Sequence, residues 1–89
     1  MEKFSFYVVI ETTTGKTYKS DVEGIKEHVQ RVFMTPANIP IEGCWDKVQH
    51  YVDSMSMFRR DSQKIYMTIG GNMTYFNPDH VLSIALVRV

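Results

Sequence analysis

The chain has 89 residues, at or below the usual size of a single domain, so we expect one hydrophobic core and a single domain over residues 1–89. With 44% hydrophobic and 22% charged residues, its composition is that of a globular protein and excludes the class of disordered chains. Ten basic residues balance ten acidic residues, so no net charge attracts the chain to nucleic acid or to an anionic membrane surface.

The first predicted element is a β-hairpin. From Phe4 to Ile10 the side chains alternate and one of the two faces is fully apolar, which is typical of a strand with one buried face. Residues 12–15 then supply a turn that ends in a glycine able to adopt a positive φ. Residues 16–19 can return from this turn as the partner strand.

A capped helix is predicted next. Residues 20–23 match a capping box, in which the Ser20 hydroxyl accepts from the Glu23 amide and the Glu23 carboxylate accepts from the Ser20 amide. Apolar residues then recur at helical spacing as far as Phe33. Pro36 ends the helix, because the residue before a proline is pushed out of the helical region.

The middle of the chain predicts a loop followed by a second, shorter helix. Residues 36–43 hold two prolines and a glycine without an apolar period, which is typical of a loop. Apolar residues from Trp45 to Met55 then follow helical spacing, while an extended strand within 44–58 stays open as an alternative. Cys44 is the one cysteine of the chain and cannot form an internal disulfide, so we expect a cytoplasmic protein.

The last third of the chain predicts a second hairpin and a terminal strand. Residues 65–76 alternate around a turn at Gly70 and Gly71, and residues 77–79 mark a further tight turn. Residues 81–87 are apolar on both faces, which predicts a strand in the middle of a sheet whose second face is covered by another copy of the chain. We therefore expect an α+β fold, with an antiparallel sheet of about five strands, one capped helix and a second shorter helix.

The sequence contains no catalytic or metal-binding motif that we recognise. Residues 15–17 resemble the end of a phosphate-binding loop, but that pattern requires a glycine at Ile10. Asp46 and His50 lie one helical turn apart, but two residues are too few ligands for a metal site. A Cys44–histidine pair stays open, because such partners meet in space and not in sequence. We therefore expect no enzymatic activity and no cofactor. We also expect no membrane partner, since the terminal apolar run is shorter than the roughly 20 residues that span a bilayer.

A group of basic and aromatic residues is the leading candidate for a ligand site. Guanidinium groups bind phosphate oxygens and aromatic faces stack on nucleobases, so this composition favours a phosphate-bearing ligand such as a nucleotide or a cyclic dinucleotide. The expected ligand-binding residues are Arg59, Arg60, Lys64, Tyr75, Phe76 and Trp45. Because no general base or metal accompanies them, we expect the ligand to be sequestered without being altered.

Two segments of the chain resemble small accessory proteins of bacteriophages and other mobile elements. One is the block Tyr75–Ile84, where a strand, an Asn-Pro turn and a terminal strand follow each other, and the other is the opening hairpin Phe6–Lys16. Some proteins of this type are anti-defence factors, including oligomeric sponges that sequester cyclic-nucleotide signals, and others block a host enzyme. The resemblance implies a homo-oligomer in the host cytoplasm and transfers no functional residue to this chain.

Two further functions stay open as alternatives. The first is a protein–protein inhibitor or regulator of a host protein, docked through an edge strand or through the helix that carries Trp45. The second is a small DNA-binding regulator. The neutral net charge and the lack of a helix-turn-helix pattern weigh against the second alternative.

Overall fold

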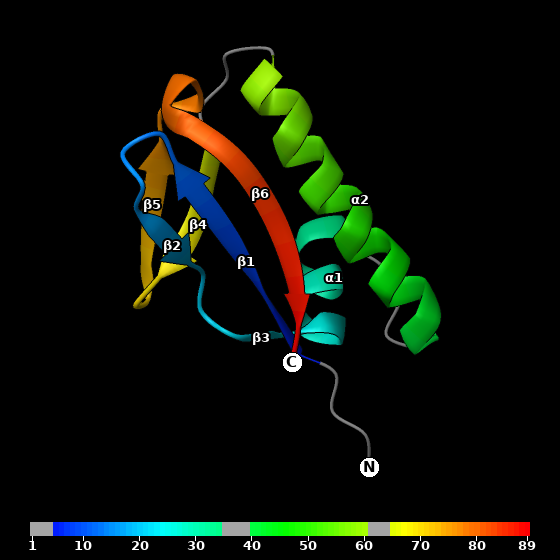
Figure 1. Ribbon diagram of the computed structural model, residues 1–89. Helices are drawn as coiled ribbons and strands as arrows, with labels where there is room; N and C mark the ends of the chain where they lie inside the picture. The colour runs from blue at the N-terminus through cyan, green and yellow to red at the C-terminus, as the bar shows by residue number, and fades with distance from the viewer. Residues whose placement is uncertain (1–4, 35–39, 61–64) are drawn as a thin grey trace.

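The computed structural model describes residues 5–34, 40–60 and 65–89, with the backbone alone for residues 58–60. Its elements follow one another along the chain as drawn in Figure 1. They are β1 (Ser5–Thr12), β2 (Thr17–Lys19), β3 (Glu23–Gly24), α1 (Ile25–Phe33), α2 (Ile41–Arg60), β4 (Ile65–Ile69), β5 (Asn72–Phe76), the 3₁₀ turn η1 (Pro78–His80) and β6 (Val81–Arg88). The predicted α+β class is confirmed.

The strands form two antiparallel sheets. β1 is the centre of the larger one: β2 and β3 pair with one side of β1, and β6 pairs with the other side. β4 and β5 form a separate two-stranded sheet. The prediction of one sheet of about five strands is therefore wrong in detail, because β4 and β5 pair with each other and not with a described strand of the larger sheet.

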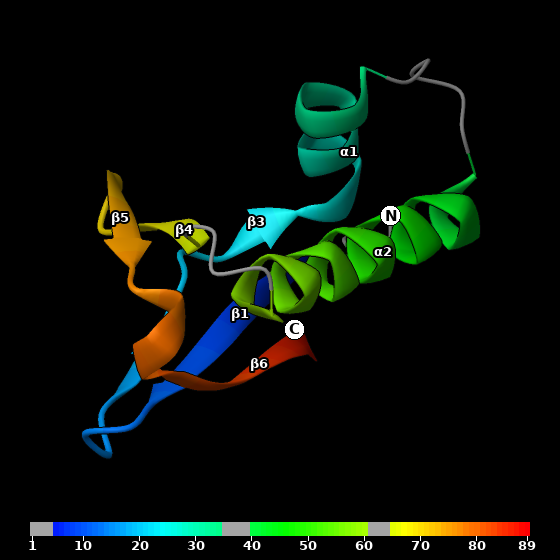
Figure 2. The same ribbon diagram turned by 90° about the horizontal axis from the view of Figure 1, so that it is seen from above.

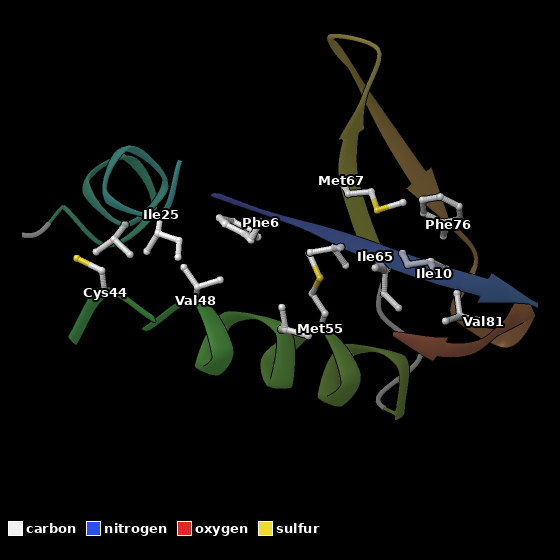
Figure 3. Packing of buried hydrophobic residues seen from close by; sticks show 13 residues of the cluster. Phe6, Ile10, Ile25, Cys44, Val48, Met55, Ile65, Met67, Phe76 and Val81 are labelled. Atoms are coloured by element: carbon white, nitrogen blue, oxygen red, sulfur yellow. The ribbon is translucent and has the colours of Figure 1, made fainter. Parts of the chain in front are cut away.

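The hydrophobic core lies between the inner face of β1, both helices and the β4–β5 hairpin. Phe6, Val8 and Ile10 alternate along β1 and are all buried, as the period of two predicts. Figure 3 shows the buried side chains as a row that runs from Ile25 and Cys44 at one end to Phe76 and Val81 at the other. Figure 2 shows α2 beside α1 and β6, two elements that it packs against.

The capping box predicted at residues 20–23 is wrong. Helix α1 begins at Ile25, and its N-cap is Gly24, which has no side chain to accept a hydrogen bond. Ser20 instead accepts the Val8 amide through its hydroxyl oxygen at 2.7 Å, and Glu23 pairs with β1 in an extended conformation. These tertiary partners outcompete the local cap that the sequence offers.

Helix α2 is longer than predicted. It begins at Ile41, inside the segment 36–43 predicted as a loop, and its 20 residues exceed the nine residues of α1. The helical interpretation of 44–58 is confirmed and the extended one is wrong. Cys44, Val48, Val52 and Met55 recur at helical spacing and are all buried, so one stripe of the helix faces the core. Neither helix of the described residues is long and apolar enough to cross a membrane.

Strand β6 lies at an edge of the larger sheet and not in its middle as predicted. Among the described strands it pairs with β1 alone. Ile84 and Leu86 pack towards the core, whereas Ala85 and Val87 lie on the opposite face of the sheet. In Figure 1 no helix lies in front of that opposite face of β1 and β6. The apolar residues on both faces of β6 therefore reflect one covered face and one face that no described helix covers.

Candidate functional site

A cleft of about 270 Å³ opens where β1, the segment before α1, both helices and β4 meet. Residues from five parts of the chain line this cleft. Ligand sites commonly form in clefts where several elements meet. The lining residues are Phe6, Val8, Ser20, Asp21, Val22, Glu23, His28, Arg31, Tyr51, Met55, Tyr66, Met67 and Thr68. We call this feature the His28 cleft.

Glu23 holds the polar wall of the His28 cleft together. One carboxylate oxygen lies 2.8 Å from His28 Nδ1, and the other lies 2.6 Å from Arg31 Nη2. Arg31 Nη2 also lies 3.4 Å from His28 Nδ1. Because a carboxylate can only accept, Nδ1 carries a proton and donates it to Glu23, so the contact between Arg31 and Nδ1 joins two donors and is no hydrogen bond. The Glu23 carboxylate therefore accepts from both His28 and Arg31.

The His28 ring is buried between two aromatic rings. The Phe6 and Tyr51 rings each lie 5.0 Å from it in edge-to-face geometry, which is the favourable arrangement for such pairs. Only 4% of the residue is exposed. Its second nitrogen, Nε2, is buried and has no hydrogen-bond partner among the residues that the structure describes. A buried polar atom without a partner is uncommon in a folded protein and calls for an explanation.

Two phenol groups complete the aromatic wall. Burial raises the pKa of the Tyr51 phenol to about 12, and the neighbouring Tyr66 phenol and its hydrogen bond to Tyr51 act in the same direction. Tyr51 thus stays protonated at neutral pH and presents a hydroxyl group to the cleft. Tyr66 lies on β4 and is partly exposed.

Asp21 stands at the mouth of the cleft and ties it to the β4–β5 turn. Its two carboxylate oxygens accept the Gly70 amide at 2.7 Å and the Gly71 amide at 2.8 Å. These bonds, that of Gly71 first, hold the pKa of Asp21 below its ordinary value. The Asp21 amide also donates to the Thr68 carbonyl at 2.9 Å. Both carboxylate oxygens therefore take part in the fold.

The described residues of the predicted ligand set are spread over several parts of the structure. Trp45 lies near the start of α2, where the Arg88 guanidinium stacks over its ring at 5.2 Å, beside a second cavity of about 310 Å³. Arg59 and Arg60 are the last two residues of α2. Fourteen residues separate Trp45 from Arg59 along one helix, a distance of about 21 Å at 1.5 Å per residue.

The two aromatic residues predicted on β5 point in opposite directions. Tyr75 is exposed, and its ring lies 5.9 Å from that of Tyr66 across the hairpin. Phe76 is buried against Tyr18 at 5.2 Å and belongs to the core. Lys64 and the side chains of the two arginines lie outside the described residues. Arg59 follows Met55 by one helical turn in α2, and Tyr75 packs on Tyr66, so these two members of the predicted set lie next to lining residues of the cleft.

The other candidate chemistry of the sequence is not assembled in the described part of the chain. Cys44 is fully buried among apolar residues, which fits its role as a small core residue. His50 and His80 are exposed. No group of three or more His, Cys, Asp or Glu residues that could hold a metal ion occurs among the described residues.

Sequence reasoning missed the residues that matter most in the His28 cleft. One signal was present: His28 follows Ile25 by three residues and precedes Val29, so it falls within the buried stripe of α1. No family model, curated protein or solved structure matches this chain. Function is therefore argued from the residues of the cleft.

Proposed function

We propose that this protein is a non-enzymatic binding protein that holds a small molecule in the His28 cleft. The observation that carries the proposal is His28, which lines the cleft and whose buried Nε2 atom has no partner among the described residues. Glu23 accepts from Nδ1 of the imidazole, so the orientation of the ring is fixed before any ligand arrives. An aromatic-lined cleft with a few fixed polar groups is what small-molecule sites have in common.

Sequestration without turnover is the mode of action that we propose. The cleft offers hydrogen-bonding groups and ring surfaces, while its ionised groups are already engaged by the fold. A phosphate-bearing ligand such as a nucleotide or cyclic dinucleotide remains our prediction, since Arg59 follows Met55 by one helical turn and Arg60 comes next. The cytoplasmic location also remains a prediction, which the unpaired and buried Cys44 supports.

A thermal-shift panel of nucleosides, nucleotides and cyclic dinucleotides tests the proposal. A ligand at a hundred times its dissociation constant stabilises the fold by about 2.7 kcal/mol, which raises the Tm of a domain of this size by roughly 11–22 °C. Mass spectrometry of the ligand released by denaturation then distinguishes binding from catalysis. A panel without any shift contradicts the binding function, and a released ligand of altered mass contradicts its non-enzymatic nature.

Self-association is a second proposal, and the face of the larger sheet that no described helix covers supports it. Tyr7 pairs with Val87 and Val9 pairs with Ala85, which places these four apolar residues side by side on that face. We call them the outer patch. Glu11 of β1 and Lys19 of β2, which pairs with Val9, flank the patch. In a two-fold symmetric contact, Glu11 of one copy can meet Lys19 of the other, so a second copy of the chain is the partner whose charges fit.

A further inference from the structure

We infer that the His28 cleft receives the uncharged nitrogen heterocycle of its ligand, of the nucleobase type, and that the heterocycle donates a hydrogen bond to His28 Nε2. This inference rests on the proposed binding function and names the part of the ligand that enters the cleft. Any phosphate of the ligand lies outside the cleft.

The proton positions on His28 decide what the ligand must supply. Nδ1 donates to Glu23, because the carboxylate oxygen 2.8 Å away can only accept. In the neutral imidazole the other nitrogen, Nε2, is then an acceptor. Since this acceptor is buried and no described residue donates to it, a ligand that reaches it must bring an N–H or O–H group.

The charges of the cleft weigh against a phosphate in this position. Asp21 and Glu23 are acidic, whereas Arg31 is the one Lys or Arg among the lining residues that the structure describes. The guanidinium of Arg31 already pairs with Glu23. A phosphate in the cleft would therefore lie near two carboxylates without an uncommitted cation, and like charges in a partly buried site repel strongly.

The remaining surfaces fit a planar ring. Phe6, Tyr51 and Tyr66 supply aromatic faces and edges, and Met55 and Met67 supply polarisable thioethers. The volume of about 270 Å³ lies just below the range of about 300–1,000 Å³ for drug-sized ligands. The cleft therefore has room for one heterocycle. Nitrogen heterocycles that carry an N–H donor, as nucleobases do, meet all of these requirements.

Calorimetric titrations with adenosine, guanosine, cytidine and uridine test the inference, with ribose 5-phosphate as the matched probe without a base. We expect at least one nucleoside to bind and ribose 5-phosphate to bind at least about tenfold more weakly. If ribose 5-phosphate or a nucleotide binds while no nucleoside does, the inference is overturned and the binding function stands. If none of these probes and no member of the thermal-shift panel binds, both fail.

A matched pair of variants locates the hydrogen bond. His28→Asn places an amide near Nδ1 for Glu23 and removes the Nε2 acceptor, whereas His28→Gln places an amide near Nε2. We expect Asn to weaken nucleoside binding by about tenfold and Gln to weaken it less. His80→Asn, the same substitution at an exposed histidine of η1 that does not line the cleft, serves as the control with unchanged binding. Equal affinity of the Asn variant and the wild type overturns the inference.

Nuclear magnetic resonance of the wild type avoids any dependence on whether the variants fold. The ¹⁵N signal of His28 Nε2 should shift on saturation with the nucleoside, while the signals of the exposed His50 and His80 stay unchanged. A bound nucleoside that leaves the Nε2 signal of His28 unmoved overturns the inference.

Discussion

The Asp21 carboxylate links two parts of the chain that are distant in sequence, and its hydrogen bonds make that link depend on pH. The amides of Gly71 and Gly70 lower the pKa of Asp21 below 3.8. A carboxylate with a lowered pKa contributes stability above its unfolded pKa, and this contribution is lost as the pH falls through the folded pKa. Below about pH 4 the link between the cleft mouth and the β4–β5 turn should therefore weaken.

Urea denaturation at a series of pH values from about 3 to 6 measures this effect. We expect Asp21→Asn to lower the free energy of unfolding at pH 6 and to flatten its fall towards pH 3, because the amide cannot gain a proton. Asp79→Asn makes the same charge change at an exposed position and is the control. An Asp21→Asn variant whose pH profile runs parallel to that of the wild type would contradict this prediction.

Tyr51 introduces the opposite dependence at alkaline pH. Its folded pKa is raised from 10.0 to about 12, so the unfolded chain releases the phenol proton before the folded protein does. The stability that this group contributes is complete below pH 10 and is lost as the pH rises from 10 to about 12.

Absorbance titration of the phenols tests the raised pKa of Tyr51. We expect one tyrosine to ionise near pH 12 in the folded protein, and we expect Tyr51→Phe to remove that late step. Tyr75→Phe, at an exposed ring, should leave the late step in place. The prediction is wrong if the step persists in Tyr51→Phe.

At the scale of elements, the β4–β5 hairpin depends on a two-residue turn. Gly70 and Gly71 have φ angles of 59° and 79°, the pattern of a type I′ turn, which favours asparagine first and glycine second. A Cβ atom at either position would meet no atom within 4 Å, so only the backbone angle limits the substitution. We expect Gly70→Asn to change the free energy of unfolding by less than about 0.5 kcal/mol and Gly71→Val to lower it by about 1–3 kcal/mol.

Urea denaturation followed by the fluorescence of Trp45, the one tryptophan of the chain, measures both variants. The two substitutions share one turn and one solvent-exposed setting, so each serves as the other's control. Equal losses of stability in the two variants would contradict the prediction, because they would show that the positive φ at Gly71 does not set the loss in the free energy of unfolding.

The same scale shows what the sequence predicts well and why. Both hairpins and the terminal strand were predictable because alternation with a period of two, followed by glycine turns, is a local signal. The start of α1 could not be predicted from the sequence. Ser20 can either cap a helix or accept the Val8 amide, and the second role arises only because β1 lies alongside. Likewise, the apolar run of β6 does not reveal whether its neighbours cover one face or both.

At the scale of the whole molecule, the His28 cleft could not be predicted because its parts meet only in the fold. Glu23, His28 and Tyr51 come from β3, α1 and α2, and Asp21 reaches a turn 49 residues away along the chain. Composition favoured arginines and aromatic residues that the fold distributes over several surfaces, as the separation of Trp45 from Tyr75 illustrates. Residue types predict chemistry, while distances between them need the tertiary structure.

Assembly of two copies through the outer patch is the last consequence of the fold. Tyr7, Val9 and Val87 are half-buried and Ala85 is exposed on a sheet face that no described helix covers. A two-fold contact would bury these apolar side chains at about 25 cal/mol per Å² and would bring Glu11 near the partner's Lys19. Light scattering of the purified chain should therefore give twice the mass of one chain.

Two aspartate substitutions separate this contact from a general effect of added charge. Ala85→Asp puts a carboxylate at the centre of the outer patch, where a second copy would bury it without a partner, so we expect a monomer. Met73→Asp adds the same charge at an exposed position on β5 and should leave the dimer intact. Because Ala85 lies on the face opposite to the core, the Asp variant should keep its fold, which circular dichroism verifies. A wild-type chain that is monomeric at all concentrations, or an Ala85→Asp variant that remains dimeric, would show that the outer patch faces solvent.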